Sequence, residues 1–268
     1  MTWRCGVIGS PIAHSLSPDL HRAAYQWLGL DWHYERHDVT ADHVADFVAG
    51  LTGSWRGLSV TMPCKRAIVA LGRPDAVTTA LGVGNTVIFD GSPSDAATTR
   101  VHNTDVSGIA LVLRDQGLDA ASAIQVYGNG ATARSCVYAL AGLGVRRVVV
   151  RARDDGKTRQ LAEAGADWGI EVVPGAGPAD VVVSTVPAAV AGQWGADLGH
   201  PYLVFDVLYD PWPTPLAGLA AARGARVATG LDLLAAQAVG QVELMTGRTV
   251  DFAVLRRAAD QGMASRIN

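Results

Sequence analysis

AIQVYGNGATARSCVYALAGLGVRRVVVRARD, residues 123–154, is the stretch that decides the fold of this chain. A short apolar run leads into two glycines, Gly128 and Gly130, and an alanine-rich run and a second β-prone run follow. This order predicts a strand, a turn, a helix and a strand, with the small residues Ala131 and Ala133 at the start of the helix. Such a glycine turn lets the backbone approach a pyrophosphate, at which the helix N-terminus points. We therefore expect a Rossmann unit that binds a dinucleotide; a methyltransferase-type fold with a similar turn is the alternative.

The end of the second strand governs which dinucleotide such a unit prefers. An acidic residue there usually binds the ribose hydroxyls of NAD, whereas a basic residue accepts the 2′-phosphate of NADP. Both signs occur together in this chain, where the charged residues are Arg151, Arg153, Lys157 and Arg159, with Asp154 and Asp155 among them. Taken alone, this charged loop is compatible with either coenzyme.

Strand-like and helix-like runs alternate through the rest of the chain, which predicts βαβ units and a parallel sheet covered by helices. In the N-terminal part we expect strands at 3–9, 32–39 and 56–62 and helices at 16–30, 42–51 and 65–71. A helix over 103–118 precedes the Rossmann stretch, further strands follow at 170–173, 179–187 and 202–210, and the chain is mostly helical from about Leu231. Two α/β units joined near Asp105 are the simplest division, with the terminal helices free to pack on the first.

Composition excludes several classes of function. The chain has 268 residues, 49% of them hydrophobic, and a formal net charge of -3, so it lacks the basic excess that nucleic acids attract. We expect no signal peptide, no membrane span of about 18 apolar residues, and reduced thiols in the cytoplasm, since its three cysteines form no CxxC pair. No metal site is expected either, because His33 and His37 on one strand would hold their rings ~13 Å apart.

Lysine is rare in this chain, and Lys65 is one of only two among 22 basic residues. Lysine can exchange its proton and arginine effectively cannot, so an acid–base role would explain its retention; chance is the alternative. Pro63 predicts a helix with Lys65 in its first turn, and Asp105 is expected at the start of the next helix. A lysine facing a fixed carboxylate suits proton transfer to or from an alcohol or carbonyl.

Two serines, Ser15 and Ser17, follow the first predicted strand. Hydroxyl groups in a loop at the carboxyl end of a strand lie where open α/β sheets bind small polar ligands. The alternative is a turn and a helix N-cap before Pro18. Motifs of serine hydrolases, P-loop enzymes and zincins are absent from the sequence.

Seven motifs in order resemble the shikimate dehydrogenase family over nearly the whole chain. They are GSPIAHSLSPDLH at 9–21, SVTMPCK at 59–65, GNTV at 84–87, NTD at 103–105, GNGATARS at 128–135, STVP at 184–187, and DVLYDPWPTPL at 206–216 followed by GLDLLAAQA at 230–238. Each motif alone is modest, but seven in order are highly specific.

The resemblance implies a two-domain α/β protein with a cleft between its domains. Residues 1–105, joined by C-terminal helices 235–268, would form the catalytic substrate domain, and 106–234 the Rossmann domain that binds NADP. Lys65 and Asp105 would be the catalytic pair, and the substrate would contact Ser15, Ser17, Thr61, Asn85, Tyr209 and Gln237. The coenzyme would contact Gly128, Asn129, Gly130, Ala131, Arg153, Lys157, Thr185, Val186 and Gly230.

Two departures from the family pattern bear on the coenzyme. Ala131 stands where the family usually has another glycine, and its Asn-Arg-Thr motif reads Ala152-Arg153-Asp154 here. Ser17 bears on the substrate, because relatives that prefer quinate resemble this pattern with a threonine.

The expected activity is the NADPH-dependent reduction of 3-dehydroshikimate to shikimate, in the shikimate pathway to chorismate and aromatic amino acids. The expected protein is a cytoplasmic monomer or homodimer with no metal, nucleic acid or membrane partner. A quinate/shikimate dehydrogenase that uses NAD and a catalytically silent nucleotide-binding relative are the alternatives.

Overall fold

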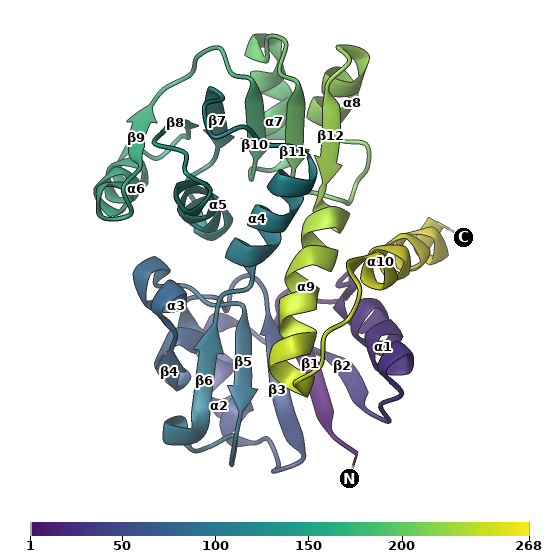
Figure 1. Cartoon of the computed structure of the whole chain (residues 1–268). Helices are drawn as coiled ribbons and strands as arrows, with labels where there is room; N and C mark the ends of the chain where they lie inside the picture. Colours follow the sequence, from purple (N-terminus) through teal and green to yellow (C-terminus); the bar gives the residue numbers. More distant parts are fainter. Residues whose placement is uncertain (1, 268) are drawn as a thin grey trace. The chain divides into compact units, whose positions relative to one another are not determined.

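Residues 2–267 are described by a computed structural model, whose contacts divide the chain into two compact units (Figure 1). The first unit comprises the residues up to Gly108 together with those from Leu234 onward, and the second comprises Ile109–Leu233. Within residues 2–267, no helix is both long and apolar enough to cross a bilayer.

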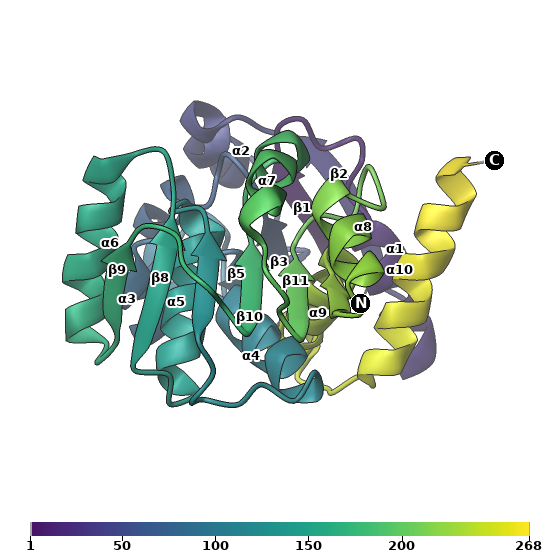
Figure 2. The same cartoon turned by 90° about the horizontal axis from the view of Figure 1, so that it is seen from above.

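The first unit is built on a six-stranded sheet with the order β2-β1-β3-β5-β6-β4. Its strands are β1 (Arg4–Gly9), β2 (His33–Asp38), β3 (Trp55–Val60), β4 (Arg73–Pro74), β5 (Thr86–Phe89) and β6 (Thr99–His102). Its helices are α1 (Ser17–Leu28), α2 (Val44–Ala49), α3 (Ala76–Leu81), the start of α4 (Asp105–Asp115), most of α9 (Gly230–Thr246), and α10 (Phe252–Ile267). Helices α1 and α10 lie side by side (Figures 1 and 2).

This first sheet is mixed, so the prediction of a parallel sheet is wrong for this unit. Strands β1, β2 and β3 are parallel neighbours, but β5 pairs antiparallel with both β3 and β6. The physical reason is the short connection over residues 90–98, which lets β6 fold back beside β5, whereas parallel strands need a long crossover. Strands β4, β5 and β6 and helix α3 were not among the predicted elements.

The segment that carries Lys65 also differs from the prediction. The expected helix at 65–71 is a short 3-10 helix over Ala67–Leu71, and Lys65 lies in the turns between β3 and this helix. The Lys65 carbonyl accepts a hydrogen bond from the Gly84 amide at 2.9 Å, and the Cys64 amide donates to the Thr61 carbonyl at 2.9 Å. Backbone hydrogen bonds of the loop thus set the position of Lys65 in place of an α-helical turn.

The second unit is a parallel sheet in Rossmann order, as the sequence predicts. Its strands are β7 (Ile124–Tyr127), β8 (Arg147–Arg151), β9 (Glu171–Pro174), β10 (Val181–Ser184), β11 (Leu203–Asp206) and β12 (Arg226–Thr229). They are ordered β12-β11-β10-β7-β8-β9, so the sheet grows outward in both directions from β7 and β10 (Figure 1). Helices α5 (Ala131–Gly142) and α6 (Asp155–Asp167) pack together, as do α7 (Ala188–Trp194) and α8 (Pro215–Ala222).

Candidate active site

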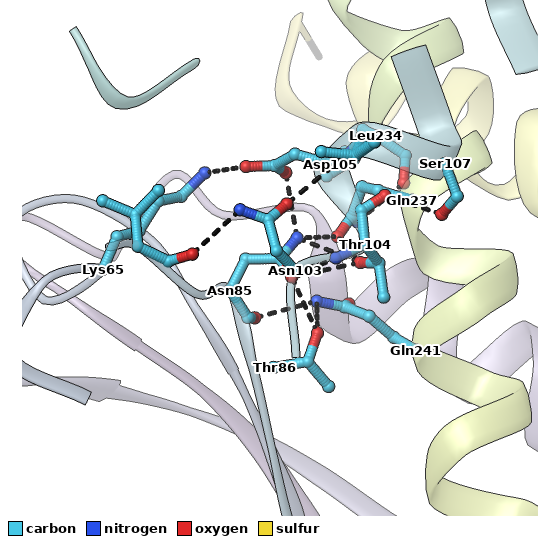
Figure 3. Close-up of polar contacts among 12 residues, drawn as sticks. Lys65, Asn85, Thr86, Asn103, Thr104, Asp105, Ser107, Leu234, Gln237 and Gln241 are labelled. Carbon is cyan, nitrogen blue, oxygen red and sulfur yellow. Dashed lines mark hydrogen bonds and ion pairs between the residues drawn. The ribbon is translucent and has the colours of Figure 1, made fainter. Parts of the chain in front are cut away.

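Lys65 and Asp105 form an ion pair in the first unit (Figure 3). The Lys65 Nζ lies 2.5 Å from Asp105 Oδ2, and the two side chains are only 17% and 9% exposed. Asp105 is the first residue of α4, where the helix dipole favours a carboxylate. A charge-assisted hydrogen bond withdrawn from solvent holds both groups in one place.

Asn85 occupies the other oxygen of the Asp105 carboxylate. Its Nδ2 donates to Asp105 Oδ1 at 2.9 Å, while its Oδ1 accepts from the Thr104 amide at 2.8 Å. The Asn85 carbonyl also accepts from the Val60 amide at 2.7 Å, which places Asn85 beside the end of β3. Each Asp105 oxygen therefore has its own donor.

Gln237 approaches the same cluster from α9. Its Oε1 lies 3.2 Å from Asn85 Nδ2, and its Nε2 donates to the Leu234 carbonyl at 2.8 Å. The approach depends on a glycine in α4, because a Cβ on Gly108 would lie 2.8 Å from the Gln237 backbone nitrogen. Replacing Gly108 would push α4 and α9 apart at the point where they bring Asp105 and Gln237 together.

Ser15, Ser17 and Thr61 lie at the carboxyl ends of the neighbouring parallel strands β1 and β3. Ser17 is the first residue of α1 and is buried, and its amide donates to Ser15 Oγ at 3.3 Å. The Ser15 carbonyl accepts from Arg36 Nε at 2.8 Å, which ties the loop to β2. A Cβ on Gly9 of β1 would collide with the Thr61 methyl group, so glycine allows the two strand ends to approach.

Tyr209 belongs to the second unit, in the segment that follows β11, and is partly buried. The first unit thus brings together Lys65, Asp105, Asn85 and Gln237, and places Ser15, Ser17 and Thr61 at the carboxyl ends of its strands.

The glycine turn of the second unit has the backbone that a pyrophosphate site requires. Gly128 has a φ of 111°, and a Cβ there would collide with Thr185 Oγ1. Gly130 precedes α5 without a side-chain cap, and a Cβ added to it would meet nothing within 4 Å. Ala131 is the first residue of α5. The amide groups of the first helical turn are therefore left for an anion.

Asn129 and Thr185 hold this turn against neighbouring loops. Asn129 Nδ2 donates to the Asp154 carbonyl at 2.7 Å and to Thr158 Oγ1 at 2.9 Å, and Thr185 Oγ1 donates to the Tyr127 carbonyl at 2.8 Å. Val186 adjoins Gly128, since a Cβ there would lie 3.1 Å from its side chain. Gly230 opens α9, where a Cβ would collide with the Val207 carbonyl.

The charged residues at the end of β8 and in the loop after it have different partners. Asp154 is the N-cap of α6, and its Oδ1 accepts from the Lys157 amide at 3.0 Å. This hydrogen bond lowers the pKa of Asp154, and Lys157 Nζ stands 3.4 Å from its other oxygen. Arg153 is exposed and, within the described part of the chain, has no ion pair or hydrogen bond. Arg151 instead pairs with Asp197 at 2.9 Å.

The sequence reasoning missed a group of buried polar residues that are hydrogen-bonded to Asn85 directly or through one another, namely Tyr34, Ser59, Thr86, Thr104 and Gln241. One signal was available in the sequence, because Gln237 and Gln241 stand four residues apart and therefore on one face of a helix. Tyr34 and Ser59 gave no such signal, since their contacts depend on the pairing of distant strands.

A Rossmann unit and a second α/β unit with a partly buried Lys–Asp pair define the class as a two-unit, dinucleotide-dependent dehydrogenase. The family model described as shikimate dehydrogenase substrate binding domain matches residues 7–87, and the one described as shikimate 5′-dehydrogenase C-terminal domain matches 230–259. A shikimate dehydrogenase (NADP(+)) of Citrifermentans bemidjiense is 36% identical over 90% of this chain and 89% of its own. The chain belongs to the shikimate dehydrogenase family.

Solved structures agree with this assignment. The crystal structure of Mycobacterium tuberculosis shikimate dehydrogenase is 37% identical, with a TM-score of 0.89 over 97% of this chain and 99% of that one. Shikimate 5-dehydrogenase from Thermus thermophilus, solved in complex with NADP(H) and shikimate, is 27% identical, with a TM-score of 0.83 over 97% of this chain and 99% of that one.

Proposed function

We propose that the protein is an NADP-dependent shikimate dehydrogenase that reversibly reduces 3-dehydroshikimate to shikimate, in the pathway to chorismate and the aromatic amino acids. The observation that carries the proposal is the Lys65–Asp105 pair, in which Lys65 donates to one oxygen of the Asp105 carboxylate and Asn85 donates to the other. Family membership and the names of full-length relatives support the substrate and the coenzyme.

The coenzyme would bind to the second unit. The residues present fit a dinucleotide, because the uncapped start of α5 and the open space at Gly130 would accept its pyrophosphate. Arg153 has a free guanidinium with which to hold a 2′-phosphate, assisted by Lys157. The further contacts that we propose are Gly128, Asn129, Ala131, Thr185, Val186 and Gly230. When bound, NADPH supplies the hydride that reduces the carbonyl carbon.

Lys65 and Asp105 would manage the proton of the reaction. As the ring carbonyl is reduced, the Lys65 ammonium donates a proton to its oxygen, so that hydride and proton together yield the alcohol. Asp105 holds the ammonium in position and stabilises its charge, and Asn85 keeps Asp105 Oδ1 occupied. In the reverse direction the pair accepts the proton of the alcohol.

The remaining substrate contacts are proposed from the hydroxyl and amide groups available. Ser15, Ser17 and Thr61 supply hydroxyl donors for the carboxylate, and Asn85 and Gln237 supply amide groups for the ring hydroxyls. Tyr209, from the second unit, would add a phenol. We further propose that the protein acts in the cytoplasm as a monomer or homodimer and needs no metal ion for this chemistry.

One assay tests the proposal against its alternatives. Shikimate and quinate are each offered with NADP and with NAD, and reduced coenzyme is followed by its absorbance. We expect the highest kcat/KM for shikimate with NADP. A highest value with NAD, or equal values for the two substrates, would identify a quinate/shikimate dehydrogenase instead. No turnover with any of the four combinations would identify a silent relative.

A further inference from the structure

A continuous series of buried hydrogen bonds leads from β2 to the catalytic pair within the first unit. The Tyr34 hydroxyl lies 2.6 Å from Ser59 Oγ, and Ser59 Oγ lies 2.7 Å from Gln241 Oε1. Gln241 Nε2 then lies 3.1 Å from the Asn85 carbonyl and 3.2 Å from Thr86 Oγ1 (Figure 3). Thr86 Oγ1 lies 2.9 Å from Asn85 Oδ1, and Asn85 holds Asp105. We call the five residues Tyr34, Ser59, Gln241, Thr86 and Asn85 the Gln241 chain.

Two backbone groups determine how both amides in the Gln241 chain are oriented. The Thr104 N–H can only donate, so the Asn85 atom that it contacts must be the oxygen. The Asn85 C=O can only accept, so the Gln241 atom that it contacts must be the nitrogen. Neither side chain can be turned by 180° without setting like groups against each other.

The orientation of the two amides fixes the direction of every other hydrogen bond. Thr86 accepts from Gln241 Nε2, so its own proton goes to Asn85 Oδ1. Ser59 must donate to Gln241 Oε1, so it accepts from the Tyr34 hydroxyl. Each proton therefore points toward Asp105.

The contact between His21 and Gln241 depends on the direction of these hydrogen bonds. Its Nε2 lies 3.2 Å from Gln241 Oε1, and an oxygen that already accepts from Ser59 requires a proton on that nitrogen. The ring is fully buried and stacked on Tyr34 at 4.1 Å between centroids, and burial lowers the pKa of His21 to about 4. Its Nδ1 has no hydrogen-bond partner among the described residues. The imidazole is thus neutral, with its proton on Nε2.

We infer that Gln241 is a positioning residue of this active site, which orients Thr86 and through it the Asn85 carboxamide that holds Asp105. Gln241 touches neither Lys65 nor Asp105, so it acts only through Asn85. The inference rests on the proposed function for its kinetic consequences. The direction of the hydrogen bonds does not depend on any substrate.

A double-mutant cycle separates this role from a general loss of stability. Gln241→Met removes both amide contacts at similar volume, and Thr86→Val removes the hydroxyl between Gln241 and Asn85. Each should lower kcat for shikimate oxidation by about tenfold, the worth of one buried hydrogen bond, and change KM by less than about threefold. Because both break the same link, the double variant should be no slower than the slower single variant.

The matched control is Gln125→Met, which makes the same change at a buried glutamine of β7 in the second unit. It should leave kcat unchanged. Rate losses that multiply in the double variant, or an equal loss in the control, would overturn the positioning role. If Gln241→Met does not fold, an unchanged kcat in Thr86→Val alone would overturn the positioning role.

Nitrogen NMR of histidine-labelled protein without ligands tests the direction independently of activity. The spectrum reports which ring nitrogen of His21 carries the proton, with His21→Phe used to assign the signals. A proton on Nε2 is expected, and one on Nδ1 would overturn the inference. Absence of shikimate turnover in the unmutated protein would instead refute the proposed function, so the two failures are distinguishable.

Discussion

His21 should make the first unit sensitive to mild acid. The histidine is fully buried, and burial lowers its pKa from 6.5 to about 4 in the folded protein. Between these two values the unfolded chain binds a proton that the folded chain does not, so the free energy of unfolding falls as the pH falls. His21 therefore does not lower the free energy of unfolding above about pH 6.5, and it lowers it progressively as the pH falls from there to about pH 4.

The size of this loss follows from the difference in pKa. One pKa unit corresponds to about 1.4 kcal/mol, so the lowered pKa of His21 costs about 3 kcal/mol of stability between neutral pH and pH 4. His21→Phe keeps a ring to stack on Tyr34 but cannot take up a proton. It loses the hydrogen bond to Gln241, which costs about 1 kcal/mol at every pH. The variant should therefore be less stable than the unmutated protein at pH 7 and more stable at pH 4.

Urea unfolding followed by tryptophan fluorescence at pH 7, 6, 5 and 4 measures this crossover. Carboxylates with a lowered pKa, such as Asp75 and Asp90, are present in both proteins and cancel in the comparison. His33→Gln is the control, because it replaces an exposed histidine of β2 in the same unit. Parallel curves for the unmutated protein and His21→Phe would refute the assignment of a neutral, buried His21.

Three further predictions concern the reaction. Lys65→Arg should lower kcat by roughly 10²–10⁴-fold with a much smaller change in KM, because charge is kept and proton exchange is lost; near-normal turnover would exclude the acid–base role. Arg153→Ala should raise the KM for NADP by at least about tenfold and leave the KM for NAD nearly unchanged. Asp154→Asn should retain NADP binding, since asparagine also caps a helix. Weaker NAD binding in Asp154→Asn would instead identify Asp154 as a ligand of the ribose. Shikimate should be preferred to quinate, and Ser17→Thr should narrow the ratio of their kcat/KM values, which steady-state kinetics with both substrates would measure; a pocket that relies on crowding rejects one added hydroxyl by only ~10²-fold.

Local chemistry explains why the Rossmann unit could be predicted. The turn at Gly128 needs a positive φ and a close approach to Thr185, and both requirements appear in the sequence as glycine followed by small residues. The central strands β7 (IQVY) and β10 (VVVS) are buried along their whole length and rich in valine and isoleucine, as expected of a parallel sheet covered on both faces. Neighbours in the chain carry most of this information.

The first sheet shows what such local signals leave out. Strands β5 and β6 have four residues each, and nothing in such short runs distinguishes an antiparallel neighbour from a parallel one. The same holds for the turns around Lys65, where the Lys65 carbonyl accepts a hydrogen bond from the amide of Gly84, a residue distant in the chain. The scarcity of lysine and the expected helix starts pointed to Lys65 and Asp105, and the family resemblance supported both, but the Gln241 chain required the strands and α9 to be placed first.

The geometry around Asp105 adds a reason why lysine stands at position 65 in a chain whose basic residues are mostly arginine. Arginine presents a planar fork that grips both oxygens of a carboxylate, whereas lysine donates from a single point. A fork at position 65 would compete with Asn85 for Asp105 Oδ1, to which Asn85 donates at 2.9 Å. Displacing Asn85 would break the hydrogen bond through which the Gln241 chain reaches Asp105. Under the proposed function, lysine would serve two requirements at once, because it would exchange a proton and it leaves the second carboxylate oxygen to Asn85.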